Sequence, residues 1–242
     1  MKLNIFMITF LFSFIECQVF FNREELASWI PSYATATEID LRSRNMSSIE
    51  ASTFSNLNSL TALYLSFNRL NSLEPTTFNS LTNLREPHLN ENKLTQIKAS
   101  TFSNLHSLIY LFIFNNELRS LDPMTFNSLA NLKTLRLDYN RLTQIEASTF
   151  SNLNSLVRLD LDNNQLSNLD PNTFSSFSNL QVLYLQSNKL IHIEASMFSN
   201  LKSLTQLWLE NNQLESIDTW VFTSLTNLQV IDLSSNQLTQ IY

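Results

Sequence analysis

The segment LTALYLSFNRLNSLEPTTFNSL, residues 60–81, is one copy of a unit that recurs every 24 residues. An asparagine marks each copy, and a phenylalanine repeats with the same step. The asparagines are Asn68, Asn92, Asn116, Asn140, Asn164, Asn188, Asn212 and Asn236. The phenylalanines are Phe54, Phe78, Phe102, Phe126, Phe150, Phe174, Phe198 and Phe222. A second period of 48 residues is superimposed, since residues 49–60 and 145–156 are identical, and it indicates growth by duplication of paired units.

Each unit begins with the pattern of a half-buried strand. Leu63 and Leu65 alternate with polar or variable residues, which is the period of two expected of such a strand. Identical strands in succession stack into a parallel sheet at about 4.8 Å per repeat. Asn68 follows the strand, where its amide can bond backbone groups that the turn leaves unpaired. Because asparagine also tolerates unusual backbone angles, we expect it to replace glycine in this turn.

The opposite wall of the stack is predicted from the phenylalanines and from two Asp-Pro pairs. The phenylalanines should form a second spine inside this wall. Asp122-Pro123 and Asp170-Pro171 predict the first residues of short helical turns. Pro87 replaces a strand leucine and lacks the N–H that the sheet needs, so it predicts a local break or bulge.

The unit resembles the leucine-rich repeat family, in the 24-residue form typical of secreted proteins and receptor ectodomains. Insect leucine-rich immune proteins and Toll-like receptor ectodomains are similar. The resemblance implies an α/β solenoid, a right-handed horseshoe with a parallel β-sheet on its concave face and short helical turns or irregular segments on its convex face. It implies nine 24-residue repeats over residues 37–242, with the last one incomplete.

The N-terminal region differs from the family pattern, which usually has disulfide-bonded cysteine clusters at both ends. Residues 1–17 have a charged start and a short apolar run, and they are predicted to be a signal peptide. Residues 18–36 are predicted to be an N-terminal cap without cysteines, in which Asn22 and Glu25 form a capping box. The helix so capped should bury Leu26, Trp29 and Ile30.

The C-terminal end also lacks cysteines. The sequence stops at Tyr242, partway through a unit. The apolar residues of the last repeat are therefore expected to face solvent and to offer a contact for a homo- or hetero-oligomer.

The composition excludes several classes of function. The chain has no glycine, so it has no phosphate-binding loop, dinucleotide fingerprint or G-x-S-x-G nucleophile elbow. Its formal net charge of −6 argues against nucleic acid as a partner, and no second apolar run predicts a membrane span. A single cysteine and three scattered histidines predict no metal cluster. We expect no cofactor and no enzymatic activity.

In this fold the variable positions beside the strand leucines point to the concave face. They differ at almost every repeat, whereas exposed framework positions such as Ser103 and Ser151 recur unchanged. This contrast predicts a binding surface. The candidate ligand-binding residues are Tyr64, Phe67, His88, Tyr110, Phe112, Phe114, Arg136, Asp138, Tyr139, Arg158, Asp160, Asp162, Tyr184 and Trp208.

The candidate surface has an aromatic and a charged zone. The aromatic zone, expected to supply the main anchors, consists of Tyr64, Phe67, Tyr110, Phe112, Phe114 and Tyr139. In the charged zone Asp138 and Asp162 should lie about 5 Å apart on adjacent strands. Neighbouring arginines can neutralise them, so we expect no calcium ion there. His88 has no nucleophile beside it, which favours a polar contact over catalysis.

These observations predict a secreted, extracellular, non-enzymatic protein that binds a protein or another macromolecule. Innate immunity and cell-surface recognition are the subclasses that the resemblance implies. The alternative is a fragment or subunit of a larger receptor or of an extracellular-matrix or adhesion protein, joined through its last repeat. Asn45-Met46-Ser47 is the glycosylation acceptor of the exported chain, at Asn45.

Overall fold

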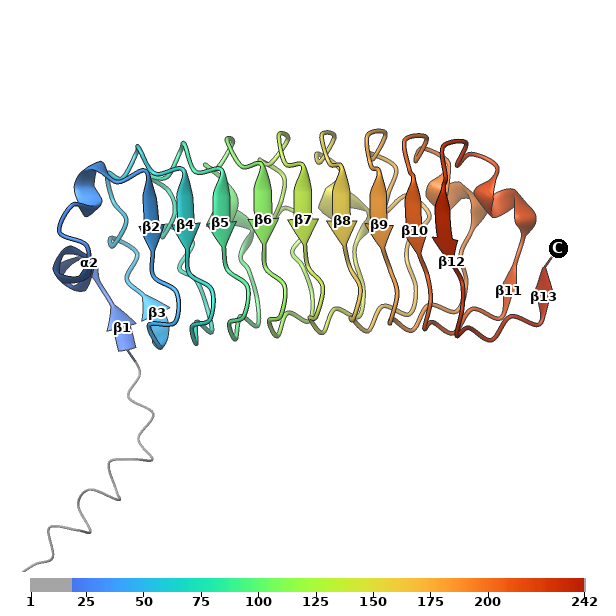
Figure 1. The fold of residues 1–242 in the computed structure, drawn as a ribbon, viewed down its shortest axis with the longest axis horizontal. Coiled ribbons are helices and arrows are strands. Elements are labelled where there is room, and N and C mark those ends of the chain that lie inside the picture. The colour runs from blue at the N-terminus through green and yellow to red at the C-terminus, as the bar shows by residue number, and fades with distance from the viewer. Residues whose placement is uncertain (1–18, 242) are drawn as a thin grey trace, which may run out of the picture.

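The computed structural model describes residues 19–241, which form one elongated stack of repeats (Figure 1). The predicted signal peptide, residues 1–17, lies outside the described residues. Within residues 19–241, no helix has both the length and the apolar character needed to cross a bilayer.

A nine-stranded parallel sheet covers one face of the stack, as the sequence predicts (Figure 1). Its strands are β2 Glu38–Asp40, β4 Ala62–Tyr64, β5 Glu86–His88, β6 Tyr110–Phe112, β7 Thr134–Arg136, β8 Arg158–Asp160, β9 Val182–Tyr184, β10 Gln206–Trp208 and β12 Val230–Asp232. Neighbouring strands pair residues that are 24 apart, such as Leu135 with Leu159. The central residue of each interior strand is buried, and its two neighbours point outward.

Each strand from β4 to β10 is followed, four residues after its end, by a buried asparagine, and the amides of these asparagines form the predicted ladder. Asn140 donates from Nδ2 to the carbonyl oxygens of Ile113 and Leu137, both at 3.1 Å. Its Oδ1 accepts from the backbone N–H of Leu118 at 3.0 Å. Leu118 and Ile113 belong to the preceding repeat, so every ladder asparagine joins two repeats.

The unusual backbone angle of the turn lies one position before the ladder asparagine, which corrects the sequence prediction. The left-handed residues on the sheet side are Ser43, Phe67, Glu91, Asn115, Tyr139, Asn163, Ser187, Asn211 and Ser235. Their φ angles lie between 51° and 58°. Asparagine adopts this conformation at little cost, but a bulky aromatic residue does not.

The predicted phenylalanine spine is confirmed inside the opposite wall. The rings of Phe78 and Phe102 stack with their centroids 6.4 Å apart, and Phe102 and Phe126 follow at 6.5 Å. Phe177 interrupts this regularity, because it stands at a leucine position and lies 5.7 Å from Phe150 and 6.0 Å from Phe174.

The outer wall consists of turns and short 3₁₀ helices. The helices of this wall are η2 Ala99–Phe102, η3 Ala147–Phe150, η4 Ala195–Phe198 and η5 Thr219–Phe222, whereas η1 Tyr33–Thr35 lies in the N-terminal segment before β2. Asp122 and Asp170 accept backbone N–H groups as the predicted caps do, at 2.8 and 2.7 Å. The segments that follow them are turns and not helices, which corrects the predicted helical start.

The N-terminal residues lie against the first repeat. Helix α2, Arg23–Trp29, begins with the predicted capping box of Asn22 and Glu25. Leu26 is fully buried, whereas Trp29 and Ile30 are partly buried against the core. β1, Val19–Phe21, pairs with β3, Met46–Ile49, beside this helix (Figure 1).

Pro87 interrupts the sheet on one side only. Towards β4 the pairing is regular, with Pro87 opposite Leu63. Towards β6 only His88 and Phe112 pair, because proline has no N–H to donate. The predicted break is therefore present, but the 24-residue register continues and no bulge forms.

The last repeat exposes part of its apolar surface. Val230 and Ile231 of β12 are 37% and 40% exposed, whereas Leu233 and Leu238 stay partly buried against the core. A separate two-stranded parallel sheet, β11 Ser216–Ile217 with β13 Gln240–Ile241, lies at this end of the stack (Figure 1).

We expect Asn140→Ala to lower the free energy of unfolding by about 3 kcal/mol, because it leaves buried backbone groups of two repeats unpaired. Asn131→Ala is the matched control, since Asn131 also donates to a neighbouring repeat, at the carbonyl of His106, but is exposed. Chemical denaturation of both variants measures the difference. Equal losses would contradict the assignment of the ladder as the main link between repeats.

Buried threonines in the outer wall give a second prediction about stability. The hydroxyls without a hydrogen-bond partner belong to Thr77, Thr101, Thr125, Thr149 and Thr173. Met197 and Val221 occupy the same position in later repeats. We expect Thr125→Val to raise the free energy of unfolding by about 1 kcal/mol. Thr53→Val should not, because Thr53 donates to the carbonyl of Phe21 at 3.3 Å. A gain in both variants, or in neither, would show that the missing partner is unimportant.

Candidate binding surface on the sheet face

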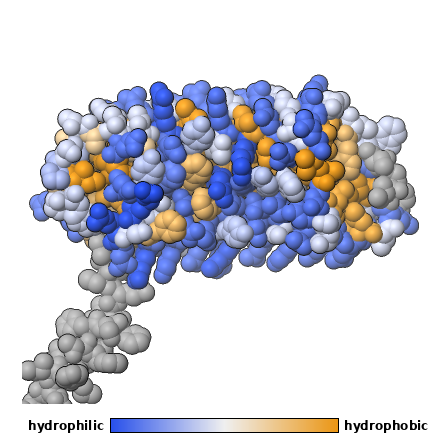
Figure 2. All heavy atoms as spheres, viewed as in Figure 1, coloured by the Kyte–Doolittle hydropathy of each residue, from blue (hydrophilic) through white to orange (hydrophobic). Residues whose placement is uncertain are grey.

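The sheet face consists of the side chains that flank the buried strand residues, and it is the side seen in Figures 1 and 2. Hydrophilic atoms cover most of it, with separate hydrophobic patches between them (Figure 2). All fourteen predicted ligand-binding residues lie on its strands or in the turns directly after them. They differ in burial and in contacts, so they do not form one uniform site.

Four ring-bearing residues form a continuous stack across the first strands. The ring centroids of Tyr64 and His88 lie 4.8 Å apart, and those of His88 and Phe112 lie 4.7 Å apart. Tyr110, which is 40% exposed, stacks on Phe112 at 6.3 Å. His88 Nε2 also lies 2.9 Å from Glu86 Oε1. We call these four residues the aromatic stack. The sequence analysis did not predict it, although the 24-residue spacing of Tyr64, His88 and Phe112 was an available signal.

Phe67 and Tyr139 stand apart from the aromatic stack. They are 57% and 55% exposed, and no ring contact joins either of them to another aromatic residue between Val19 and Ile241. Both occupy the left-handed turn position, with φ angles of 58° and 51°. The predicted aromatic zone is therefore divided: Tyr64, Tyr110 and Phe112 belong to the aromatic stack, whereas Phe67 and Tyr139 are separate exposed rings.

Phe114, the sixth member of that zone, lies under a cation. The guanidinium carbon of Arg136 lies 3.9 Å from its ring centroid. Arg158 covers Tyr184 in the same way at 4.9 Å, and Tyr184 stacks on Trp208 at 6.0 Å. Such contacts hold both arginine side chains against the surface.

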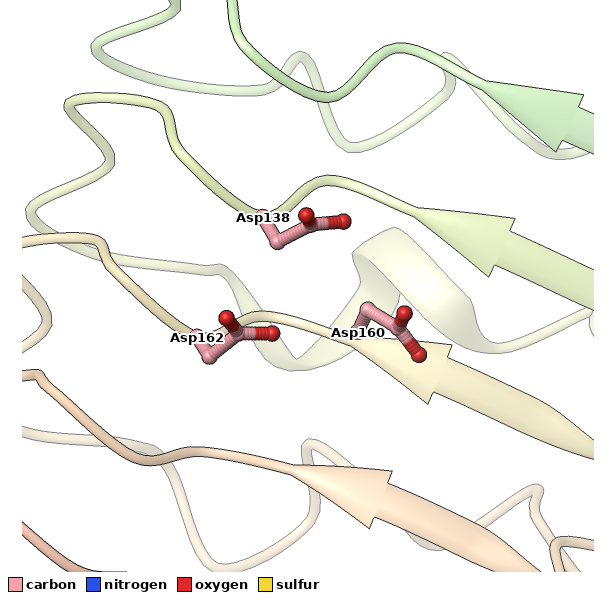
Figure 3. Close-up of side chains that lie close together, drawn as sticks. All are labelled: Asp138, Asp160 and Asp162. Carbon is pink, nitrogen blue, oxygen red and sulfur yellow. The ribbon is translucent and has the colours of Figure 1, made fainter.

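Three aspartates converge where β7 and β8 end, with carboxylate oxygens within 4.8 Å of one another (Figure 3). Asp138 and Asp160 are each 2% exposed and Asp162 is 8% exposed. The sequence placed these carboxylates on the surface, whereas the structure buries all three, and arginines bond to two of them. Arg136 makes two bonds to Asp138, at 3.0 and 2.7 Å, and Arg158 makes two to Asp160, both at 2.8 Å.

The three aspartates are not electrostatically equivalent. Asp160 also lies 3.2 Å from Nε of Arg136, so it has two cationic neighbours, although burial still raises its pKa. Asp162 has only a neutral donor, the amide of Asn163 at 2.8 Å. Burial, with a smaller contribution from Asp138 and Asp160, raises the pKa of Asp162 to about 6.

The carboxylate cluster offers oxygen ligands of the type that calcium prefers. The guanidinium groups already occupy oxygens of Asp138 and Asp160. Asp162 alone lacks a cationic neighbour among the residues from Val19 to Ile241. A divalent ion would therefore have to displace both arginines.

Two residues that the sequence analysis did not select share the position of Asp162 in the next repeats, Gln186 and Glu210. One oxygen of each, Oε1 of Gln186 and Oε2 of Glu210, is buried without a hydrogen-bond donor. Burial also raises the pKa of Glu210. The 24-residue spacing was again the available signal. Asn45, the predicted glycosylation acceptor, is exposed in the first left-handed turn.

Comparison with known proteins agrees with the geometry of the stack. Models of the family described as leucine rich repeat match residues 35–86, 82–142, 114–166, 130–190 and 154–214, and a two-copy model matches residues 202–242. No curated protein sequence matches the chain.

Similar solved structures include TLR13 in a TLR13–ssRNA13 complex, with 26% identity and a TM-score of 0.78 over 90% of this chain and 35% of TLR13. A leucine-rich repeat protein of Leptospira interrogans has 26% identity and a TM-score of 0.75 over 92% of this chain and 60% of its own length. Toll of Drosophila, in the Toll–Spatzle complex, has 24% identity and a TM-score of 0.79 over 85% of this chain and 29% of its own. The chain thus spans about a third of the two Toll-type proteins.

We expect the aspartate cluster to make stability depend on pH. The folded chain binds the proton of Asp162 more tightly than the unfolded chain, because burial raises its pKa from 3.8 to about 6. The contribution of Asp162 to the free energy of unfolding therefore falls as the pH rises from about 4 to about 6 and is level above that.

Asp162→Asn should accordingly raise the free energy of unfolding at pH 7.5 by about 1–2 kcal/mol, and by less at pH 4.5. Asp160→Asn is the control and should destabilise at pH 7.5, because it removes the carboxylate shared by Arg136 and Arg158. Thermal melts at the two pH values give the comparison. An Asp162→Asn variant that is less stable at pH 7.5 would contradict the electrostatic assignment.

Proposed function

Because the chain belongs to the leucine-rich repeat family, we propose that it is a secreted, non-enzymatic protein that binds a protein ligand through its sheet face. Innate-immune or cell-surface recognition is the setting that the likeness to Toll-like receptor ectodomains favours. The charged start and short apolar run of residues 1–17 support export.

One observation carries the proposal: Phe67 and Tyr139 combine backbone strain with exposure. A bulky residue in the left-handed region costs about 1–3 kcal/mol. More than half of each side chain is exposed, so burial recovers little of this cost. Asparagine or serine stands at the same position in most other repeats. Strain without a compensating contact in the folded chain is typical of residues kept for binding.

The neighbouring surface supports the same use. The aromatic stack occupies β4, β5 and β6, whereas Phe67 and Tyr139 lie in the turns that follow β4 and β7. Aromatic side chains provide large contact areas with few rotamers to fix, and they are enriched among the residues that dominate interfaces.

A protein ligand fits this surface better than a nucleic acid. TLR13 in the similar structure is in complex with RNA, so the fold itself does not exclude such a ligand. In this chain carboxylates outnumber arginines on the sheet face, and they repel a phosphate backbone. The exclusion of nucleic acid rests on this charge and stays a prediction.

We expect the double variant Phe67→Asn, Tyr139→Asn to be more stable than the natural chain and to bind its partner at least tenfold more weakly. Removing strain of about 1 kcal/mol at each site should raise the melting temperature by about 2–4 °C per site. Loss of two exposed rings should weaken binding. Partners are captured from extracellular fluid, identified by mass spectrometry, and their affinities are then measured with each variant.

Ser187→Asn is the matched control, because it changes the same turn position at a partly exposed site without an aromatic ring. It should leave binding unchanged. Phe102→Ala should instead destabilise the fold by about 3–5 kcal/mol through loss of the buried spine. If the double variant gains stability and binds its partner normally, the sheet face has been wrongly assigned.

A further inference from the structure

The net charge of the chain is concentrated on the sheet face. The three outward positions of its nine repeats carry eight carboxylates: Glu38, Asp40, Glu86, Asp138, Asp160, Asp162, Glu210 and Asp232. They carry three guanidinium groups, on Arg42, Arg136 and Arg158. The face therefore has an excess of five negative charges, against −6 for the whole chain. The other surfaces of residues 19–241 carry little net charge, so within this part of the chain the sheet face is the one that strongly favours a basic partner.

Each of the three arginines already has a carboxylate partner on the same repeat. Arg42 bonds to Asp40 at 2.6 Å, Arg136 to Asp138 at 2.7 Å and Arg158 to Asp160 at 2.8 Å. The remaining carboxylates have no arginine or lysine within 4.0 Å among the described residues. The negative excess is therefore available to a ligand.

Part of this excess lies in a row of buried acceptors. Asp162, Gln186 and Glu210 occupy one position of three successive repeats, after β8, β9 and β10, and we call them the acceptor row. Oε1 of Gln186 and Oε2 of Glu210 are shielded from solvent and have no donor. Asp162 is 8% exposed and has one neutral donor. Buried acceptors without donors are unfavourable in the free chain, and a cationic donor removes that cost.

We propose that the acceptor row receives lysine or arginine side chains of the protein that binds the sheet face. This inference rests on the proposed function and names the chemistry of its ligand. An ammonium group has three donors and a guanidinium group has five, which suits a row of acceptors spaced by about 4.8 Å. The stacked rings of Tyr184 and Trp208 stand on the neighbouring position of the repeats of Gln186 and Glu210. Arg158 already covers Tyr184, so Trp208 offers the apolar wall to the aliphatic stem of such a side chain.

A random dodecapeptide library displayed on phage, selected against the whole chain, tests the proposal. We expect the enriched peptides to carry lysine or arginine and a net positive charge. Synthetic copies should bind the Asp162→Asn, Glu210→Gln double variant at least tenfold more weakly than the natural chain. The matched control is Glu50→Gln, Glu194→Gln, which removes two exposed carboxylates from the opposite wall. It should change the affinity less than twofold.

The outcomes separate this inference from the proposed function. The enriched peptides could instead be neutral or acidic, and bind normally to the acceptor-row variant but not to Phe67→Asn, Tyr139→Asn. That result overturns the inference and leaves the proposed function intact. Peptides affected by neither variant, or a selection without enrichment, count against both. A melting temperature raised by millimolar calcium chloride in the natural chain, but not in Asp162→Asn, shows a metal-ion site and also overturns the inference.

Discussion

Everything in this molecule depends on one buried amide group per repeat. The chain must leave the sheet after three residues, and this leaves backbone N–H and C=O groups inside the stack, where an unpaired group is unfavourable. The ladder asparagine pairs with such groups in its own repeat and in the preceding one, as Asn140 does with Leu137 and Leu118. One side chain completes the hydrogen bonds of two repeats. An insertion within the unit would therefore separate the asparagine from its partners in both repeats. The strict 24-residue register follows.

The same turn determines where strain is stored. A residue in the left-handed region must precede each ladder asparagine, and the chain has no glycine to place there. Asn115, Asn163 and Asn211 fit at little cost, whereas Phe67 and Tyr139 do not. The framework thus bears its largest backbone strain on the face whose side chains vary most. Phe67 and Tyr139 therefore lower the stability of the fold, and we attribute their presence to recognition.

The sequence predicted the features that follow from spacing and local chemistry. Strand positions, the amide ladder, the phenylalanine spine and the Asn22–Glu25 capping box are confirmed, since each needs only residues at fixed separations. The burial of Asp138 and Asp160 was not predicted. It depends on how Arg136 and Arg158 fold back along their own strands, and this is a property of side-chain packing. The turn angle was assigned to the ladder asparagine because that residue recurs, although the neighbouring position has the unusual φ. Phe177 entered the spine because it fills space next to Phe150, which periodicity does not describe.

Buried polar groups of three kinds show how the interior and the sheet face differ. The ladder amides are fully bonded and hold the repeats together. The buried threonine hydroxyls of the outer wall lack hydrogen-bond partners. The core encloses them, so no ligand can supply a partner and the loss of stability remains. The acceptor row also lacks donors, yet Gln186 and Glu210 lie on the sheet face and are only partly buried as residues. A ligand can therefore contact these two side chains at the surface, whereas it cannot contact the enclosed threonines. A missing hydrogen bond alone does not indicate a ligand site, because its position decides whether a ligand can reach it. Among residues 19–241, only the sheet face combines an accessible position with an uncompensated negative charge.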